Sequence, residues 1–374
     1  MASPAATRLL YYCSMALTRR DLLRATAASA ALRFVDPAYA QPEQRTIGYC
    51  VVGLGRIAGH FLEGSRSSKY TRITGLVSGN REKAEKIAWE YNVPPASIYS
   101  YENYDAIAGN KAIDAVIVCL PNSMHAEYTI RAARAGKHVL CEKPMCTGVS
   151  DGQAMIEACR KANKKLMIAY RCHYEPLHLK AVQLLREGRL GSIHTIESAF
   201  GFNIAPGEWR LDRKLAGGGP LMDVGIYCLN ACRYLTAEEP ADLKGNMTVV
   251  GHDPRFKEVE EHVAWTMKFP SGVVANCQCT YGVGMPGYFH VRGSKGTLHM
   301  EPAFNYDGLR LAARIDGQPP MDETNPERDP AQFPRETDHL AECIFQDKTP
   351  KSSGEEGLRD IRLMMEIYKS CGRV

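Results

Sequence analysis

Short apolar runs alternate with amphipathic stretches through the first half of the chain. The runs predict buried strands at 47–52, 72–78, 115–120, 138–141 and 166–170. Between the strands, helical spacing of apolar residues predicts one helix that ends near Arg66 and further helices at 82–91, 125–135 and 151–163. Repeated strand–helix units of this length indicate an α/β Rossmann domain, a doubly wound parallel sheet that binds ligands at the carboxyl ends of its strands.

The pattern changes after residue 176. One helix is predicted at 178–187 and a long strand at 193–200, and apolar and polar residues then alternate cleanly in 263–269 and 273–281. Such alternation is typical of half-buried antiparallel strands. We therefore expect a second, α+β domain with a large open, mostly antiparallel sheet. The open face needs a cover, either the domain's own helices or the matching sheet of a second subunit.

The first strand runs into the glycine-rich segment Gly53-Leu54-Gly55-Arg56-Ile57-Ala58. This is the G-x-G-x-x-A form of the dinucleotide-binding fingerprint. Gly53 permits a tight turn, Gly55 lets a pyrophosphate approach the backbone, and Ala58 lets the following helix pack closely. The sequence therefore predicts a dinucleotide site at this turn.

The residues after the second strand predict which dinucleotide is bound. An acidic residue there would contact the adenosine ribose, but this chain has Ser78-Gly79-Asn80-Arg81-Glu82-Lys83. A hydroxyl followed by two cations suits a 2′-phosphate, so NADP is favoured over NAD. The alternative is that Arg81 and Lys83 only begin a solvated helix face.

Polar residues also follow two later strands, in Pro121-Asn122 and Glu142-Lys143-Pro144. Lys143 is a catalytic candidate because a cation beside a nicotinamide can orient a substrate hydroxyl and lower the pKa of a neighbouring acid or base. The alternative is an ordinary surface lysine.

A second catalytic candidate is the segment 217–227, in which Pro220 is placed at the start of a helix. Asp223 and Tyr227 are four residues apart and share one helix face. A carboxylate and a phenol on one face could take a proton from a sugar hydroxyl. The alternative is an Asp–Tyr hydrogen bond that locks the helix.

The first forty residues read as a leader. Thr18-Arg19-Arg20-Asp21-Leu22-Leu23-Arg24 is followed by a weakly apolar run at 25–32 and by Ala38-Tyr39-Ala40, a small-x-small cleavage site. This order predicts a twin-arginine signal, hence export of the folded protein to the periplasm by the twin-arginine machinery. A frayed amphipathic helix is the alternative. The predicted parts are then the leader 1–40, the nucleotide-binding domain 41–170 and the second domain 171–374.

Composition narrows the function further. The leader carries five arginines and accounts for most of the formal net charge of +4, so the near-neutral body offers no basic field for nucleic acid. No apolar run is long enough for a transmembrane helix, so stable membrane insertion is not expected. The cysteines are scattered, and the pair Cys277 and Cys279 is expected in a core rather than at a metal, so no metal site is predicted.

Together these segments resemble the Gfo/Idh/MocA family, which includes glucose–fructose oxidoreductase, inositol dehydrogenase and aldose–aldose oxidoreductase. The resemblance runs from Gly53-Leu54-Gly55 through Glu142-Lys143-Pro144 and 170–174 to 219–227 and Gly354-Glu355-Glu356-Gly357. Many family dehydrogenases have histidine where Tyr227 stands, whereas tyrosine is typical of the sugar oxidoreductase branch. The resemblance implies that Tyr227 is the acid/base and that Lys143 and Asp223 assist it.

The resemblance also implies a binding site for tightly held NADP. Ser78 and Lys83 would hold the 2′-phosphate, Arg56 and Tyr101 would lie near the adenosine, and Trp209 and Arg210 would close over the cofactor. The full predicted cofactor set is Gly53, Gly55, Arg56, Ile57, Ser78, Arg81, Lys83, Tyr101, Leu120, Pro121, Asn122, His125, Glu142, Lys143, Trp209 and Arg210. Arg171, Tyr174 and Tyr288 are predicted substrate ligands, although each could equally be a structural residue.

Export and NADP together suggest a mechanism. An exported enzyme has no soluble NADP pool, so we expect the cofactor to stay bound while one aldose is oxidised to its aldonolactone and a second sugar is reduced to an alditol. A free phenol has a pKa of about 10, so a tyrosine base needs a neighbouring cation such as Lys143. The alternatives are an aldose dehydrogenase with exchangeable NADP, an NAD-dependent glycosidase of the same fold, and a non-catalytic sugar or NADP sensor.

The resemblance bears on assembly as well. Glucose–fructose oxidoreductase has a long arm before its first strand, whereas here only residues 41–46 separate the predicted cleavage site from that strand. We therefore expect a homodimer formed through the open sheets rather than a tetramer sealed by arms.

Overall fold

The computed structural model describes residues 45–327 and 331–373. Thr46 to the C-terminus forms one compact unit. The predicted leader lies outside the described residues. In the described part of the chain, no helix is long and apolar enough to cross a membrane.

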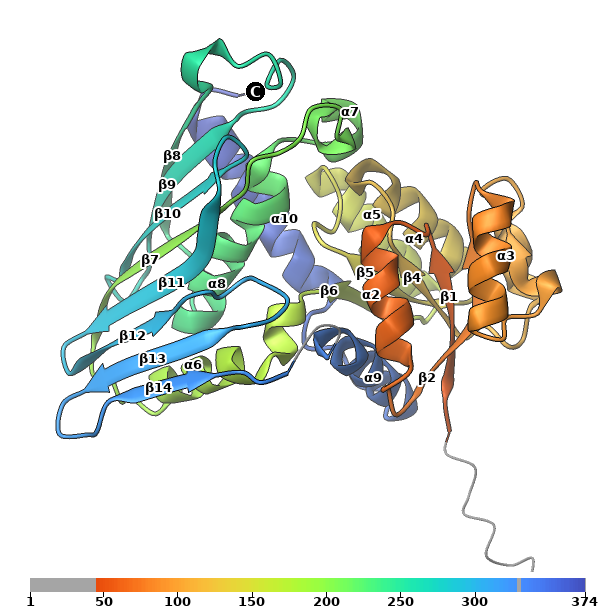
Figure 1. Cartoon of the computed structure of the whole chain (residues 1–374), viewed down its shortest axis with the longest axis horizontal. Coiled ribbons are helices and arrows are strands. Elements are labelled where there is room, and N and C mark those ends of the chain that lie inside the picture. Colours follow the sequence, from red (N-terminus) through yellow and green to blue (C-terminus); the bar gives the residue numbers. More distant parts are fainter. Residues whose placement is uncertain (1–44, 328–330, 374) are drawn as a thin grey trace, which may run out of the picture. The chain divides into compact units, whose positions relative to one another are not determined.

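The first half forms a six-stranded parallel sheet in the order β3-β2-β1-β4-β5-β6 (Figure 1). The strands are β1 (Ile47–Val52), β2 (Thr71–Val77), β3 (Ile98–Tyr99), β4 (Ala115–Val118), β5 (His138–Glu142) and β6 (Leu166–Ala169). The helices between them are α2 (Arg56–Ser65), α3 (Arg81–Glu90), α4 (His125–Arg134) and α5 (Val149–Lys161). The strand order reverses beside β1, which is the position where doubly wound sheets bind ligands.

The predicted Rossmann domain is therefore confirmed. The predicted strands and helices of this half are present, and their ends differ from the prediction by one or two residues. All six residues of β1 and all four of β4 are buried, which explains why these strands appear as unbroken apolar runs.

The second half forms an eight-stranded sheet in the order β14-β13-β12-β11-β7-β10-β9-β8. The strands are β7 (Ile193–Gly201), β8 (Asp242–Thr248), β9 (His262–Lys268), β10 (Val274–Thr280), β11 (Met285–Gly293), β12 (Gly296–Met300), β13 (Arg310–Ile315) and β14 (Met321–Thr324). Neighbouring strands are antiparallel except β7 and β10, which pair in parallel. The predicted large, mostly antiparallel sheet is confirmed.

Three helices cover one face of this sheet: α6 (Pro176–Arg186), α8 (Ile226–Thr236) and α10 (Gly354–Ser370) (Figure 1). Side chains alternate between the two faces, so Val263, Trp265 and Met267 of β9 are buried under the helices, whereas Thr266 and Lys268 are exposed. Within the described residues, no helix covers the opposite face.

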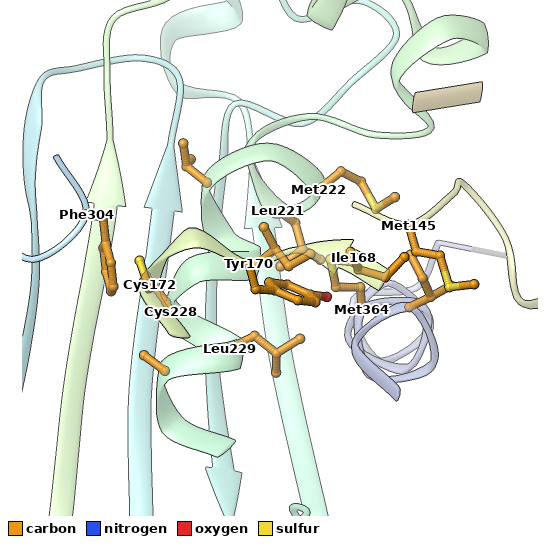
Figure 2. Close-up of a cluster of buried hydrophobic side chains, with 14 of the residues drawn as sticks. Met145, Ile168, Tyr170, Cys172, Leu221, Met222, Cys228, Leu229, Phe304 and Met364 are labelled. Atoms are coloured by element: carbon orange, nitrogen blue, oxygen red, sulfur yellow. The ribbon is translucent and has the colours of Figure 1, made fainter. Parts of the chain in front are cut away.

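A continuous hydrophobic core joins the two halves. Figure 2 shows Tyr170, directly after β6, beside Leu221 of the π-helical turn η7 (Leu221–Gly225), with Met364 of α10 in the same cluster. This packing fixes the carboxyl ends of the parallel strands against η7 and α8.

Helix α9 (Gln332–Phe345) crosses back to the first half. It follows β14 in the chain but packs on α2 and β2, and its Phe333 and Leu340 belong to the core of the first sheet. The predicted domain boundary at residue 171 therefore separates the two sheets. It places α9 in the second domain, although α9 packs on the first sheet.

Candidate active site

A cavity of about 1210 Å³ lies between the carboxyl ends of the parallel strands and the second sheet. It brings most of the predicted site residues together. Its lining includes Gly53, Gly55, Arg56, Ile57, Ser78, Lys83, Tyr101, Leu120, Pro121, Asn122, His125, Glu142, Lys143, Arg171, Trp209, Arg210, Asp223 and Tyr227.

The glycine-rich turn after β1 forms one end of this cavity. Gly53 has φ 86°, and a Cβ there would lie 2.6 Å from the carbonyl oxygen of Cys119, so only glycine fits. A Cβ at Gly55 would meet no described atom within 4 Å. Gly55 is the N-cap of α2, and within the described residues no side chain caps that helix. The first amides of α2 are therefore open to an anion.

Ser78, Lys83 and Tyr101 line the cavity beyond β2. The Ser78 hydroxyl oxygen accepts a hydrogen bond from the Asn80 amide at 3.0 Å. Lys83 is exposed and forms no ion pair within residues 45–327 and 331–373. A hydroxyl and an unpaired ammonium thus face the position where the fingerprint places an adenosine ribose.

Arg81 is a correction to the predicted cofactor set, because it is not part of the cavity lining. Its Nε donates to Glu85 at 2.8 Å, one helical turn further along α3, and its Nη1 donates to the Ile98 carbonyl at 3.1 Å. The spacing of four residues favours this local pair. Arg81 therefore fits the solvated-face alternative, whereas Lys83 lines the cavity.

Asp223 forms the charged centre of the site. One carboxylate oxygen lies 3.2 Å from the Lys143 ammonium, and the other accepts hydrogen bonds from Arg210 Nε at 2.8 Å and the Tyr281 hydroxyl at 2.9 Å. Burial by itself would raise the pKa of Asp223, but Lys143, Arg210 and the Tyr281 hydrogen bond outweigh burial and hold it well below its usual value. Asp223 is therefore anionic at any working pH.

Lys143 follows β5 directly and is held by Asp223 in two ways. Its ammonium donates to the Asp223 backbone carbonyl at 2.9 Å in addition to the carboxylate contact. Burial lowers the pKa of Lys143, but the electrostatic effects of Tyr227 and Asp223 outweigh burial and raise it. The raised pKa favours the charged form of Lys143.

Tyr227 lies in the first turn of α8, with cations against its ring. The Lys143 ammonium is 4.8 Å and the Arg171 guanidinium 5.1 Å from the ring centroid, and Arg171 Nε donates to the phenolic oxygen at 3.2 Å. In the part of the chain that the structure describes, no hydrogen bond joins Asp223 to Tyr227. The two residues share one face of the cavity, as their spacing predicts, without locking each other.

Close packing of η7 sets the positions of Asp223 and Tyr227. A Cβ at Gly225 would lie 2.8 Å from Cys279 Sγ of β10, so glycine allows the helix to rest directly on the sheet. Pro220 precedes η7 with φ −60°, as expected for a proline at a helix start.

Glu142, Asn122 and His125 line the cavity beside Lys143. Burial raises the pKa of Glu142 to about 7. The two ring nitrogens of His125 lie 2.8 Å from the carbonyl oxygens of Pro144 and Leu120, and Asn122 Nδ2 donates to the Ala216 carbonyl at 2.9 Å. His125 and Asn122 thus tie the strand-end loops together.

The segment 202–210 crosses the cavity between β7 and helix α7 (Arg213–Ala216). Its Glu208 accepts a hydrogen bond from Arg56 Nη2 at 2.9 Å, across the cavity from the glycine-rich turn. The Arg210 guanidinium lies 4.7 Å from the Trp209 ring centroid and also contacts Asp223. This segment links the nucleotide-binding turn to the charged centre.

The predicted substrate ligands Tyr174 and Tyr288 are corrections, because neither lines the cavity. The Tyr174 hydroxyl is buried and 3.1 Å from Ser352 Oγ. Tyr288 is on the uncovered face of the second sheet, since its neighbour Phe289 packs on His178 of α6 and successive strand residues alternate. Its ring stacks on His290 at 4.6 Å.

Several lining residues were not predicted from the sequence. They come mainly from the loop between β12 and β13 and from β7: Phe200, Phe202, Glu208, Phe304, Asn305, Tyr306 and Asp307. Pro302, Asn305, Asp307 and Gly308 identify a loop from the sequence, but its place at the cavity depends on the strand order. Glu208 is a neighbour of Trp209 and Arg210 and could have been included with them.

Comparison with known proteins identifies the family. The family described as "Oxidoreductase family, NAD-binding Rossmann fold" matches residues 47–170, and the "GFO/IDH/MocA C-terminal domain" matches residues 178–299. The chain is also 34% identical over 307 residues to D-xylose 1-dehydrogenase [NADP(+)] of Haloarcula marismortui, covering 79% of this chain and 83% of that protein. The chain belongs to the Gfo/Idh/MocA oxidoreductase family.

Two solved structures are similar to this chain. Aldose-aldose oxidoreductase from Caulobacter crescentus, in complex with glycerol, is 42% identical with a TM-score of 0.84, over 88% of this chain and 98% of that one. A levoglucosan dehydrogenase, at 20% identity and a TM-score of 0.75 over 88% of this chain and 98% of that one, shows the shared fold alone. The predicted family and the prediction of an oxidoreductase are confirmed.

Proposed function

We propose that this Gfo/Idh/MocA protein oxidises an aldose to its aldonolactone and reduces a second sugar to an alditol, while NADP stays bound between the two half-reactions. One observation carries the proposal: a single cavity joins an open helix N-terminus and Ser78 with Lys83 to the Lys143–Asp223–Tyr227 cluster. The 42% identity to an aldose-aldose oxidoreductase and the 34% identity to an NADP-dependent xylose dehydrogenase support it.

The cavity fits NADP. The first amides of α2 beyond Gly55 would hold the pyrophosphate, and Ser78 with Lys83 would hold the 2′-phosphate, to which their hydroxyl and unpaired ammonium are suited. Tyr101 would border the adenosine and Glu142 the nicotinamide end. When bound there, NADP supplies hydride acceptance and hydride donation.

Proton transfer is assigned to Tyr227. During oxidation its phenolic oxygen takes the proton of the sugar hydroxyl, and during reduction it returns that proton to the new alcohol. Lys143, fixed by Asp223, orients the sugar hydroxyl and favours the negative phenolic oxygen, since its ammonium lies 4.8 Å from the ring centroid. Asp223 keeps two partly buried cations, Lys143 and Arg210, in place.

Retention of the cofactor is assigned to the segment 202–210. Its ion pair between Glu208 and Arg56 would close the cavity over a bound dinucleotide. An exported enzyme has no supply of NADP and must keep its cofactor bound. The predicted twin-arginine leader is therefore the reason to propose cofactor retention. Periplasmic location and a homodimer through the uncovered sheet face belong to the same proposal.

The test uses the chain from Gln41 onward, dialysed exhaustively. Glucose is added without nucleotide, the absorbance of reduced nicotinamide is followed, and a second sugar is then added. We expect a rise of about one equivalent per subunit that falls when the second sugar arrives. Tyr227→Phe should retain the nucleotide. The rate of its absorbance rise should fall by about 100-fold or more, as expected when a general acid/base is removed.

Other outcomes identify the competing functions. A rise only after NADP is supplied would indicate an aldose dehydrogenase with exchangeable cofactor; the Haloarcula marismortui relative is named as an NADP-dependent xylose dehydrogenase. No rise with NADP and several aldoses would contradict the proposal and favour a glycosidase or a sensor.

A further inference from the structure

Arg171 is a buried cation with an unusual set of partners. It lies in the short helix η5 (Arg171–Tyr174) directly after β6 and is 5% exposed. Its Nη1 donates to the Asn305 carbonyl at 2.9 Å and to Gln332 Oε1 at 2.7 Å, its Nη2 donates to the Phe304 carbonyl, and its Nε donates to the Tyr227 hydroxyl. Four of its five N–H groups are therefore occupied by the protein.

These partners are all uncharged. Within residues 45–327 and 331–373, no carboxylate forms an ion pair with Arg171. Lys143, the other cation on the Tyr227 ring, is paired with Asp223 at 3.2 Å. A buried positive charge without an anionic partner favours the appearance of a negative charge next to it, and the nearest group able to provide one is the Tyr227 hydroxyl.

Among the described residues, Arg171 is the one cation next to Tyr227 that has no anionic partner. The titratable groups that face or adjoin Tyr227 are Lys143, Tyr170, Arg171, Cys172, Asp223, Tyr234 and Tyr306. Glu142 lines the same cavity and Glu336 is buried, and burial raises the pKa of both carboxyls although Arg171 lowers it, so burial favours their neutral forms.

We propose that Arg171 is a positioning residue that acts through Tyr227, donating its Nε–H to the phenolic oxygen and stabilising the negative charge of that oxygen before it takes the sugar proton. The proposal rests on the proposed acid/base role of Tyr227. In the proton step, the O–H bond of the sugar breaks, an O–H bond forms on Tyr227, and the Arg171 hydrogen bond keeps one side of that oxygen occupied, so that the proton arrives from the cavity side.

This role differs from the substrate-ligand role predicted from the sequence. A sugar ligand needs N–H groups that point into free space, whereas Arg171 has one such group left. Loss of a ligand raises KM at every pH. Loss of a positioning cation lowers the rate of hydride transfer most at low pH, where the phenol is hardest to ionise.

The first experiment compares wild type, Arg171→Gln and Arg171→Lys in single turnover across pH, with sugar binding measured separately. For Arg171→Gln we expect hydride transfer to fall about 10- to 100-fold at low pH, the loss for one hydrogen bond to a charged group, and the pH midpoint to rise by about one to two units. Arg171→Lys keeps the charge and should recover part of the shift. A higher sugar Kd with an unchanged midpoint would overturn the proposal.

A second pair of variants alters the charge without touching Arg171. Gln332→Glu places a carboxylate on Arg171 Nη1 with almost no change in size, and Gln332→Met removes the same contact without adding charge. We expect Gln332→Glu to raise the pH midpoint and Gln332→Met to move it clearly less. Equal shifts in the two variants would overturn the argument from charge.

A readout without turnover separates this proposal from the proposed function. The ultraviolet difference spectrum between each variant and its Tyr227→Phe counterpart reports tyrosinate at Tyr227 alone. Tyrosinate should form at higher pH in Arg171→Gln than in wild type, even if no sugar is oxidised. An unchanged titration would overturn the role of Arg171, whereas a shifted titration in a protein without hydride transfer would contradict only the proposed function.

Discussion

At the scale of single residues, charge compensation organises the site. Asp223 contacts two cations, Lys143 and Arg210, and one hydroxyl, that of Tyr281. Removing one partner of a buried ion pair leaves the other charge uncompensated. In the folded protein, these partners hold the pKa of Asp223 below its usual value. The stability that Asp223 contributes is therefore present at pH values above the usual pKa range of carboxyls and is lost only in strong acid.

Glu142 is expected to have the opposite pH dependence. Burial raises its pKa to about 7, so the folded protein binds a proton that the unfolded chain releases near pH 4.5, and stability falls as pH rises between these values. The size is of the order of 1–3 kcal/mol. Glu142→Gln should therefore gain stability relative to wild type at pH 8 and show little difference at pH 4. Urea unfolding at both pH values measures this, and an equal difference at the two would contradict it.

Ser78 and Lys83 should decide the cofactor preference. Lys83→Ala removes the unpaired ammonium, and Ser78→Asp adds a carboxylate that repels a 2′-phosphate and can bind ribose hydroxyls. We expect NADP binding to weaken by about 10- to 100-fold in the double variant and the preference to turn towards NAD. Arg81→Ala is the matched control, since Arg81 pairs with Glu85 and should affect the preference little. Calorimetric titration of nucleotide-free protein compares wild type, the double variant and Arg81→Ala.

At the scale of elements, the segment 202–210 should govern cofactor release. The Arg56–Glu208 pair is largely exposed on the arginine side, so its strength is modest, about 0–1 kcal/mol. Glu208→Gln should therefore speed NADP dissociation about two- to fivefold and reduce its salt dependence. Glu157→Gln removes the exposed ion pairs of Glu157 with Arg160 and Lys161 on α5 and serves as control. NADPH release is followed by chasing bound NADPH with excess NADP. Equal release rates for wild type and Glu208→Gln would contradict the role of the segment 202–210 in cofactor retention.

The elements also show what the sequence could predict. Residues next to the strands of the first sheet were placed well, because parallel strands fix where their carboxyl ends lie. Tyr288 was misplaced because the sequence does not show which face of the second sheet turns towards the cavity, and Tyr288 lies on the uncovered face. The role of Arg171 depends on carbonyls of the β12–β13 loop and on Gln332 of α9, which only the folded chain brings together.

At the scale of the whole molecule, the second sheet presents an uncovered face that carries aromatic and polar side chains. The Tyr288 ring stacks on His290 at 4.6 Å, and His290 lies 4.4 Å from His299 on the next strand. These side chains are partly exposed, which suits a contact with the same face of a second copy.

We therefore expect the protein to be a homodimer through this face. Tyr288→Arg would add a positive charge to this face of each copy and should convert dimer to monomer, because like charges brought together in an interface are strongly unfavourable. Trp89→Arg is the matched control: Trp89 is 87% exposed on α3, away from the second sheet, and its replacement should leave the mass unchanged. Light scattering during size-exclusion chromatography gives the mass of each variant. A monomeric wild type, or a Tyr288→Arg variant that stays dimeric, would refute assembly through the open sheet.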